Sequence, residues 1–139
     1  MLMDRQKGSL LVVDVQTRLL PAIADGEAVL ANCSWLVGVA RRVGVPVVVS
    51  EQYPQGLGPT AAPLREAAGD ARVVTKTHFS CVSDGCLDGT EVDARCQVVV
   101  VGTEAHVWVE ANLDGAGWVG FDPTPDRDKV PQTEVPQPK

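Results

Sequence analysis

The sequence predicts an α/β fold built on a parallel β-sheet. Short apolar runs rich in valine recur along the chain, and segments with helical spacing lie between the first of them. Strands that alternate with helices in this way form parallel sheets joined by right-handed crossovers. The 139 residues, 45% of them hydrophobic and 22% charged, have the size and composition of one ordinary globular domain.

The first predicted strand is Leu10 to Val15, a nearly continuous apolar run typical of a strand buried on both faces. A helix is expected over residues 27–43, where apolar side chains fall on one stripe. Asp25 is a suitable N-cap for this helix, and Gly44 followed by Pro46 is a suitable stop.

Three more strands and one helix complete the predicted pattern. The letters PVVVSE indicate the second strand, RVVTK the third, and QVVVVG, from Gln97 to Gly102, the fourth. Between the second and third strands, TAAPLREAAG predicts a short helix that is broken or started by Pro63. Ligands bind at the carboxyl ends of strands in open parallel sheets, so the residues that follow each run are candidate site residues.

Polar and charged side chains end or follow all four predicted strands. They are Asp14 and Gln16, then Glu51, Gln52 and Tyr53, then Lys76, Thr77 and His78, and finally Thr103, Glu104 and His106. An acid and a lysine at one rim can form a pair in which lysine stabilises anionic charge and the carboxylate moves protons. The alternative is that these residues are only solvated strand ends. Asp14 stands apart, because a carboxylate inside an apolar strand needs a partner.

Charge and cysteine content exclude several classes of function. The net charge of −6, without any basic run, argues against nucleic acid or an anionic membrane as a partner. The N-terminus resembles neither a secretory signal nor a membrane span, so a cytoplasmic location is expected. The four cysteines show no CxxC pair and no metal-ligand spacing, so free thiols are expected and neither a metal nor a cofactor. A small molecule is the expected ligand.

Four ordered motifs carry a resemblance to a known family. LLVVDVQTRLLPAI, GVPVVVSEQYPQGLGPT, VVTKTHFSC and QVVVVGTEAHV, within residues 8–107, resemble the isochorismatase-like cysteine hydrolases. The resemblance implies a doubly wound α/β sheet and a hydrolase of small amides, esters or vinyl ethers. It also implies Asp14 as the general base and Lys76 as the charge stabiliser. The histidines that some amidohydrolase relatives use as metal ligands are missing after the second strand.

The family's nucleophilic cysteine maps onto Trp108. An indole has no nucleophilic electron pair for acyl chemistry, so covalent catalysis at this position is excluded. The resemblance therefore implies a hydrolase by descent whose activity is lost or reduced.

The rest of the chain resembles a second family. HVWVEANLDGAGWVGFDPTP alternates apolar and polar residues about a glycine-rich turn, which predicts a β-hairpin. Residues 106–125 resemble the catalytic hairpin of transglutaminase-like proteins, and His106 and Asp122 map onto its histidine and aspartate. The expected organisation is an incomplete, truncated α/β domain over 1–105, this hairpin over 106–125, and a proline-rich, disordered or extended tail over 126–139.

Two further hypotheses remain open from the sequence. The fourth strand would lie at an open apolar edge, which favours a non-catalytic binding or self-assembly module and a homo-oligomer. The hairpin could instead add to that edge. Alternatively, Cys81 lies beyond the third strand and could serve a thiol enzyme with His106. Cys33, on the apolar stripe of the first helix, is expected in the core.

Overall fold

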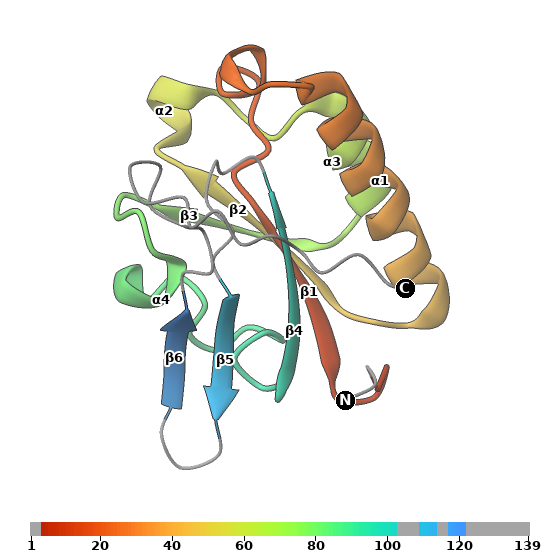
Figure 1. Ribbon diagram of the computed structural model, residues 1–139, viewed down its shortest axis with the longest axis vertical. Coiled ribbons are helices and arrows are strands. Elements are labelled where there is room, and N and C mark those ends of the chain that lie inside the picture. The colour runs from red at the N-terminus through yellow and green to blue at the C-terminus, as the bar shows by residue number, and fades with distance from the viewer. Residues whose placement is uncertain (1–3, 103–108, 114–116, 122–139) are drawn as a thin grey trace, which may run out of the picture.

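The structure, a computed structural model, describes residues 4–102, 109–113 and 117–121. Its centre is a four-stranded, all-parallel sheet in the order β3-β2-β1-β4 (Figure 1). The strands are β1 (Gly8–Val13), β2 (Val47–Gln52), β3 (Arg72–Lys76) and β4 (Gln97–Gly102). The chain first builds outward from β1 to β3 and then returns to the other side of β1, which is a doubly wound order with its switch point between β1 and β4. The predicted fold class is confirmed.

Each face of the sheet is covered by a different part of the chain. Helices α1 (Gly26–Val43) and α3 (Ala62–Ala68) lie on one face, and the β3–β4 connection lies on the other (Figure 1). That connection includes the short helix α4 (Cys81–Asp84). The single turns η1 (Leu20–Ala22) and α2 (Pro54–Leu57) lie in loops after β1 and β2.

Strand β1 divides the apolar core into two clusters. Leu10 and Val12 pack toward α1 and α3, together with Val37 and Leu64. Leu11 packs on the opposite side, in the cluster that contains Cys81, Leu87 and Val92. Successive strand residues point to opposite faces, and this explains why almost every residue of β1 is buried. Cys33 lies in the first cluster, as predicted.

Several predicted boundaries and contacts differ from those observed. The first strand begins at Gly8 and ends at Val13, so Asp14 follows the strand instead of lying inside it. Asp25 occupies the N-cap position of α1, but its φ of 56° is left-handed and its side chain makes no capping hydrogen bond. The third and fourth strands have the predicted bounds, and Pro63 lies in the first turn of α3.

Strand β4 is the edge of the described sheet, and all six of its residues are half-buried. The hairpin predicted after it is confirmed by β5 (Val109–Leu113) and β6 (Gly117–Phe121), which pair antiparallel. These two strands form a sheet of their own and do not add to β4. Trp108, His106, Asp122 and the predicted tail lie outside the described residues.

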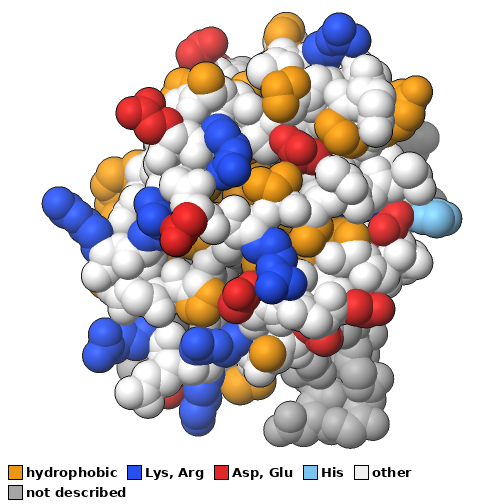
Figure 2. Space-filling view, turned by 180° about the vertical axis from the view of Figure 1, so that it is seen from behind, with side chains coloured by type: hydrophobic (Ala, Val, Ile, Leu, Met, Phe, Trp, Pro, Cys, Tyr) orange, Lys and Arg blue, Asp and Glu red, His pale blue; other side chains and the backbone are white. Residues whose placement is uncertain are grey.

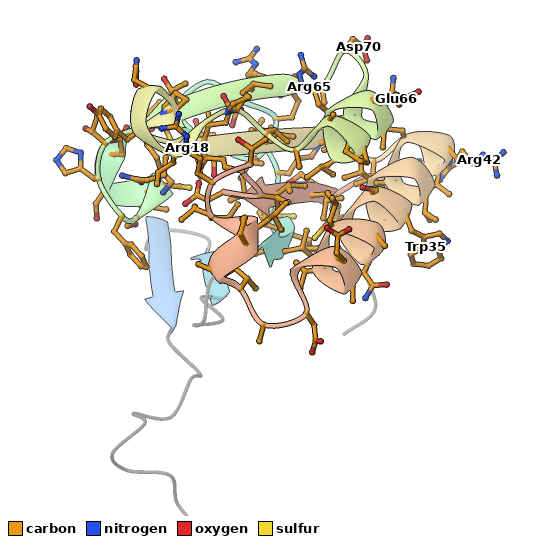
Figure 3. All side chains as sticks on the ribbon, turned by 90° about the horizontal axis from the view of Figure 1, so that it is seen from above. Arg18, Trp35, Arg42, Arg65, Glu66 and Asp70 are labelled. Atoms are coloured by element: carbon orange, nitrogen blue, oxygen red, sulfur yellow. The ribbon has the colours of Figure 1, made fainter. Side chains whose placement is uncertain are left out.

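The surface carries charges of both signs. On the face in Figure 2, acidic and basic side chains are interspersed. Arg41 and Asp70 form an ion pair of 3.0 Å between side chains that are 42% and 95% exposed, an arrangement that contributes about 0–1 kcal/mol. Trp35 and Arg42 project from α1 away from the sheet (Figure 3).

Replacing Gly38 by alanine is expected to raise the free energy of unfolding by about 1 kcal/mol. Gly38 lies inside α1, and a Cβ atom there would meet nothing within 4 Å. Urea denaturation measures the change. Gly26→Ala is the matched control with the opposite sign, because its Cβ would lie 2.5 Å from the backbone oxygen of Leu20. Equal stability of the two variants would contradict this prediction.

Candidate functional site

The candidate site is centred on a buried ion pair at the carboxyl end of the sheet. Lys76 Nζ lies 2.9 Å from Asp14 Oδ2, and the two side chains are 0% and 2% exposed. Asp14 follows β1 and Lys76 ends β3, so the pair spans the end of β2. The structure thus brings together the two residues whose convergence the sequence predicted, and gives the Asp14 carboxylate the partner it needs.

Polar groups from β2 and from the segment before α4 complete this pair. The Ser50 hydroxyl donates to Asp14 Oδ1 over 2.9 Å. Lys76 Nζ also donates to Gln52 Oε1 over 2.7 Å and to the Phe79 carbonyl oxygen over 2.9 Å. A buried ion pair is tolerated only when further hydrogen bonds satisfy its remaining atoms. The arrangement keeps a cation and a carboxylate in fixed positions away from water.

Gln16 fixes the ends of two strands and the loop that follows β2. Its Nε2 donates to the backbone oxygens of Gln52 and Gly58 over 3.0 and 2.7 Å, and its Oε1 accepts from the Gln52 amide over 2.7 Å. Gln16 is fully buried. It therefore positions Gln52, whose side chain binds Lys76.

Ser50, Gln16 and Gln52 acquire roles that the sequence did not reveal. In the sequence, Gln16 and Gln52 are distinguishable only as polar residues at strand ends, and no motif marks Ser50. The signal for Ser50 was a hydroxyl at the end of the apolar run Val47 to Val49. A buried hydroxyl needs a hydrogen-bond partner, just as the Asp14 carboxylate does.

The backbone is strained beside the site. Asp14 has a φ of 55° and Tyr53 a φ of 35°, in a region that side chains other than glycine seldom adopt. Each such residue costs on the order of 1–3 kcal/mol and persists only where its surroundings hold it. The Asp14 amide donates to the Ser50 carbonyl oxygen, and the Tyr53 amide to that of Lys76. Backbone hydrogen bonds from neighbouring strands therefore hold both residues.

The structure places Cys81 next to the ion pair but keeps its thiol buried. Its side chain contacts the Ser50 hydroxyl, and Lys76 is close enough to act on it electrostatically. Burial raises the pKa of the Cys81 thiol, and Ser50 and Lys76 oppose that rise only in part. A thiol in this environment is protonated at neutral pH, unlike an activated nucleophile. His106, its expected partner, lies outside the described residues.

His78 and Asp84 form a separate pair beside a small pocket. Asp84 Oδ2 accepts from the His78 and Thr77 amides and lies 2.9 Å from His78 Nδ1. The pocket has a volume of about 160 Å³ and lies among Tyr53, Thr75, Thr77 and Asp84. Lys76 lines it as well, so the pocket adjoins the candidate site at the carboxyl ends of β2 and β3.

Within residues 4–102 and the two hairpin strands, no three His, Cys, Asp or Glu side chains are grouped so that they could hold a metal ion. Among the described helices, none is both long and apolar enough to cross a membrane.

The contribution of Asp84 to stability is expected to disappear in acid. Hydrogen bonds from the His78 ring and then from the His78 and Thr77 amides hold the pKa of Asp84 below its ordinary value. A depressed native pKa stabilises the fold above the unfolded value of about 3.9, and this stability is lost as the pH falls through the native pKa. Asp84→Asn should therefore lower the urea midpoint at about pH 6. The difference in midpoint between the variant and the parent chain should become smaller as the pH falls. An effect that does not change with pH would contradict this.

The chain is similar to proteins of one family. Residues 9–132 match the family model described as the isochorismatase domain. Isochorismatase domain-containing protein 2A from Mus musculus is 40% identical over 103 residues, which cover 72% of this chain and 48% of that protein. A hypothetical protein from Trypanosoma cruzi has a TM-score of 0.64 and 27% identity, over 77% of this chain and 57% of that one.

A third similarity extends to the fold alone. The YcaC gene product of Escherichia coli, described as an octameric hydrolase of unknown specificity, has a TM-score of 0.61 and 20% identity, over 72% of this chain and 52% of that one. The chain spans between 34% and 52% of the length of the curated isochorismatase domain-containing relatives that it matches. The family match also runs across residues 106–125, and these relatives give no support to the transglutaminase-like resemblance there.

Proposed function

The chain belongs to the isochorismatase domain family, and from this premise we propose that it is a hydrolase by descent whose activity toward a small amide, ester or vinyl ether is lost or severely reduced. The buried Asp14–Lys76 pair supports the descent, because it supplies a proton-transfer group and a cation at the carboxyl end of the sheet. Trp108 supports the loss, because it occupies the position at which the resemblance implies a nucleophilic cysteine.

The Asp14 carboxylate, the Lys76 ammonium and a thiolate at position 108 would each have a different role in hydrolysis. With an amide or ester substrate, a thiolate at position 108 would attack the carbonyl carbon, and Lys76 would stabilise the negative charge that develops on oxygen. Asp14 would hold the proton that the leaving group takes up. The indole of Trp108 offers no such attack, so the proton-transfer group and the cation would be left without a covalent step.

Trp108→Cys is the experiment that tests this proposal. We expect the variant to hydrolyse p-nitrophenyl acetate, with a rate that rises as the new thiol ionises, and to be alkylated at position 108 with the same pH dependence. Trp35→Cys is the matched control, because Trp35 is 69% exposed on α1 and a thiol there should be alkylated without hydrolysis. A Trp108→Cys variant that behaves like Trp35→Cys would overturn the proposal.

A second candidate function is self-assembly through the edge of the sheet. Strand β4 pairs with β1 on one side, its six residues are half-buried, and the described hairpin strands pair with each other instead. An edge of this kind favours pairing with another strand. The octameric description of the Escherichia coli structure fits assembly. We propose that two copies of the chain pair along β4. In this second candidate function, the site around Asp14 and Lys76 binds a small molecule without catalysis.

Sedimentation velocity over a hundredfold range of concentration tests the second candidate. Assembly through β4 predicts a sedimentation coefficient that rises with concentration. Hydrogen exchange at the β4 amides should slow over the same range, because pairing protects them. A well-folded chain that stays monomeric throughout would exclude this function.

The third alternative, a thiol enzyme that uses Cys81 with His106, stays a prediction. The contact between Cys81 and Ser50 and the nearby Lys76 favour it, and the raised pKa of Cys81 opposes it. Brief iodoacetamide treatment followed by peptide mapping decides the matter. If Cys81 reacts no faster than Cys86 or Cys96, the alternative is excluded. The cytoplasmic location and the transglutaminase-like origin of residues 106–125 also stay predictions.

A further inference from the structure

Helix α4 and the turn after it bring two cysteines together. Gly85 ends the helix with a φ of 78°, and its amide donates to the Val82 carbonyl oxygen. This left-handed turn directs the chain back, so that Cys86 Sγ donates to the Cys81 carbonyl oxygen over 3.5 Å. The two thiols are close enough to influence each other's ionisation. They belong to the same apolar cluster beneath the sheet.

We propose that Cys81 and Cys86 form a site of oxidative modification, at which a peroxide converts the two thiols into a disulfide. Cys81 is the attacking thiol and Cys86 the resolving thiol. The site lies beside the Asp14–Lys76 pair, but its oxidation needs no hydrolase activity. The tests of this site and of the proposed function can therefore fail independently.

The surroundings of the two sulfur atoms assign this order. Burial raises the pKa of both thiols. Lys76 opposes that rise at both thiols, and the Asp14 carboxylate adds to it at Cys81. Only Cys81 has the Ser50 hydroxyl as well, and this hydroxyl stabilises its thiolate. The pKa of Cys86 rises to about 12, first through burial and then through the neighbouring Cys81. The thiolate is the nucleophile toward peroxides, and only a small fraction of either thiol is ionised at neutral pH. The reaction is therefore slow, and the cysteine with the better-stabilised thiolate attacks first.

The reaction balances with hydrogen peroxide as the oxidant. The Cys81 thiolate attacks one peroxide oxygen, the O–O bond breaks, and the departing hydroxide takes up a proton to become water. Cys81 is now a sulfenic acid. Cys86 loses its proton and attacks the Cys81 sulfur, so that the S–S bond forms, the S–O bond breaks and a second water leaves. The two thiols have lost two protons and two electrons, and the peroxide has gained them.

The test uses the full chain carrying Cys96→Ser, because Cys96 is exposed and would cross-link molecules. Trypsin releases residues 77–95 as one peptide, which contains Cys81 and Cys86 and no other cysteine. After hydrogen peroxide treatment we expect this peptide to be lighter by two hydrogens, with loss of iodoacetamide labelling at both cysteines. Cys33, buried against the other face of the sheet, should still be labelled after unfolding.

Two variants and a dimedone trap test the order of attack. In Cys86→Ser the sulfenic acid has no resolving thiol, so dimedone should label Cys81. In Cys81→Ser, Cys86 should remain a thiol. Dimedone on Cys86 in Cys81→Ser would overturn the assigned order. The proposal of a disulfide is overturned if peptide 77–95 keeps both thiols at a peroxide dose that oxidises Cys96 in the parent chain. This comparison does not require Cys81→Ser or Cys86→Ser to fold.

Discussion

Replacing Lys76 by methionine is expected to lower the free energy of unfolding by about 3–5 kcal/mol. Methionine has a similar volume but no charge, so the Asp14 carboxylate would stay buried without its cation. Gln52 Oε1 and the Phe79 carbonyl oxygen would lose their donor as well. Urea denaturation at neutral pH, followed by circular dichroism, measures the loss.

A double-mutant cycle separates the ion pair from simple packing. Asp14→Asn keeps a residue that tolerates the left-handed φ of this position. The double variant that combines it with Lys76→Met should lose much less free energy of unfolding than the sum of the two single losses. In the double variant, neither charge is left buried without its partner. Asp70→Asn is the surface control, since it removes an exposed ion pair worth about 0–1 kcal/mol. If Lys76→Met costs no more than Asp70→Asn, the buried pair does not stabilise the fold as proposed.

Gln16→Leu is expected to destabilise the chain by roughly 3 kcal/mol or more, because three backbone groups lose a partner and each such loss costs about 1–3 kcal/mol. These groups are the amide and carbonyl of Gln52 and the carbonyl of Gly58. The leucine side chain matches the volume of glutamine closely but offers no polar atom. Urea denaturation again gives the magnitude.

The matched control for Gln16→Leu is Gln55→Leu. Gln55 is exposed on α2, and surface substitutions of this kind usually change stability by about 0.5 kcal/mol or less. Limited proteolysis adds a local readout, because the loop after β2 should be cut faster in Gln16→Leu than in the parent chain. Equal effects of the two leucine variants would show that the amide contacts of Gln16 contribute nothing.

The sequence predicted those features that a local pattern determines. Strands β3 and β4 are short valine-rich runs between segments rich in polar residues, and their bounds were predicted correctly. Helix α1 has eighteen residues and a clear apolar stripe. Helices α2 and α4 have four residues each, about one turn, and one turn is too short to show a periodic pattern.

The hydrogen-bond network of the site could not be predicted in the same way. The sequence predicts that Asp14 and Lys76 pair, because both lie at the carboxyl ends of strands and their charges are opposite. The hydrogen bonds that Ser50 and Gln16 make depend on the register between β1 and β2, which aligns Val13 with Ser50. Register follows from the packing of whole strands, so a short stretch of sequence does not specify which polar atoms will meet.

The sheet order also has a consequence for synthesis on the ribosome. Strand β1 is made first, yet it is a central strand, and its neighbour β4 follows much later: Ser9 and Gln97, which are hydrogen bonded, lie 88 residues apart. At about 5–20 residues per second, β1 waits on the order of ten seconds for that partner. During translation its apolar edge is exposed to other nascent chains, and a chaperone that shields it until β4 emerges would raise the yield of folded protein.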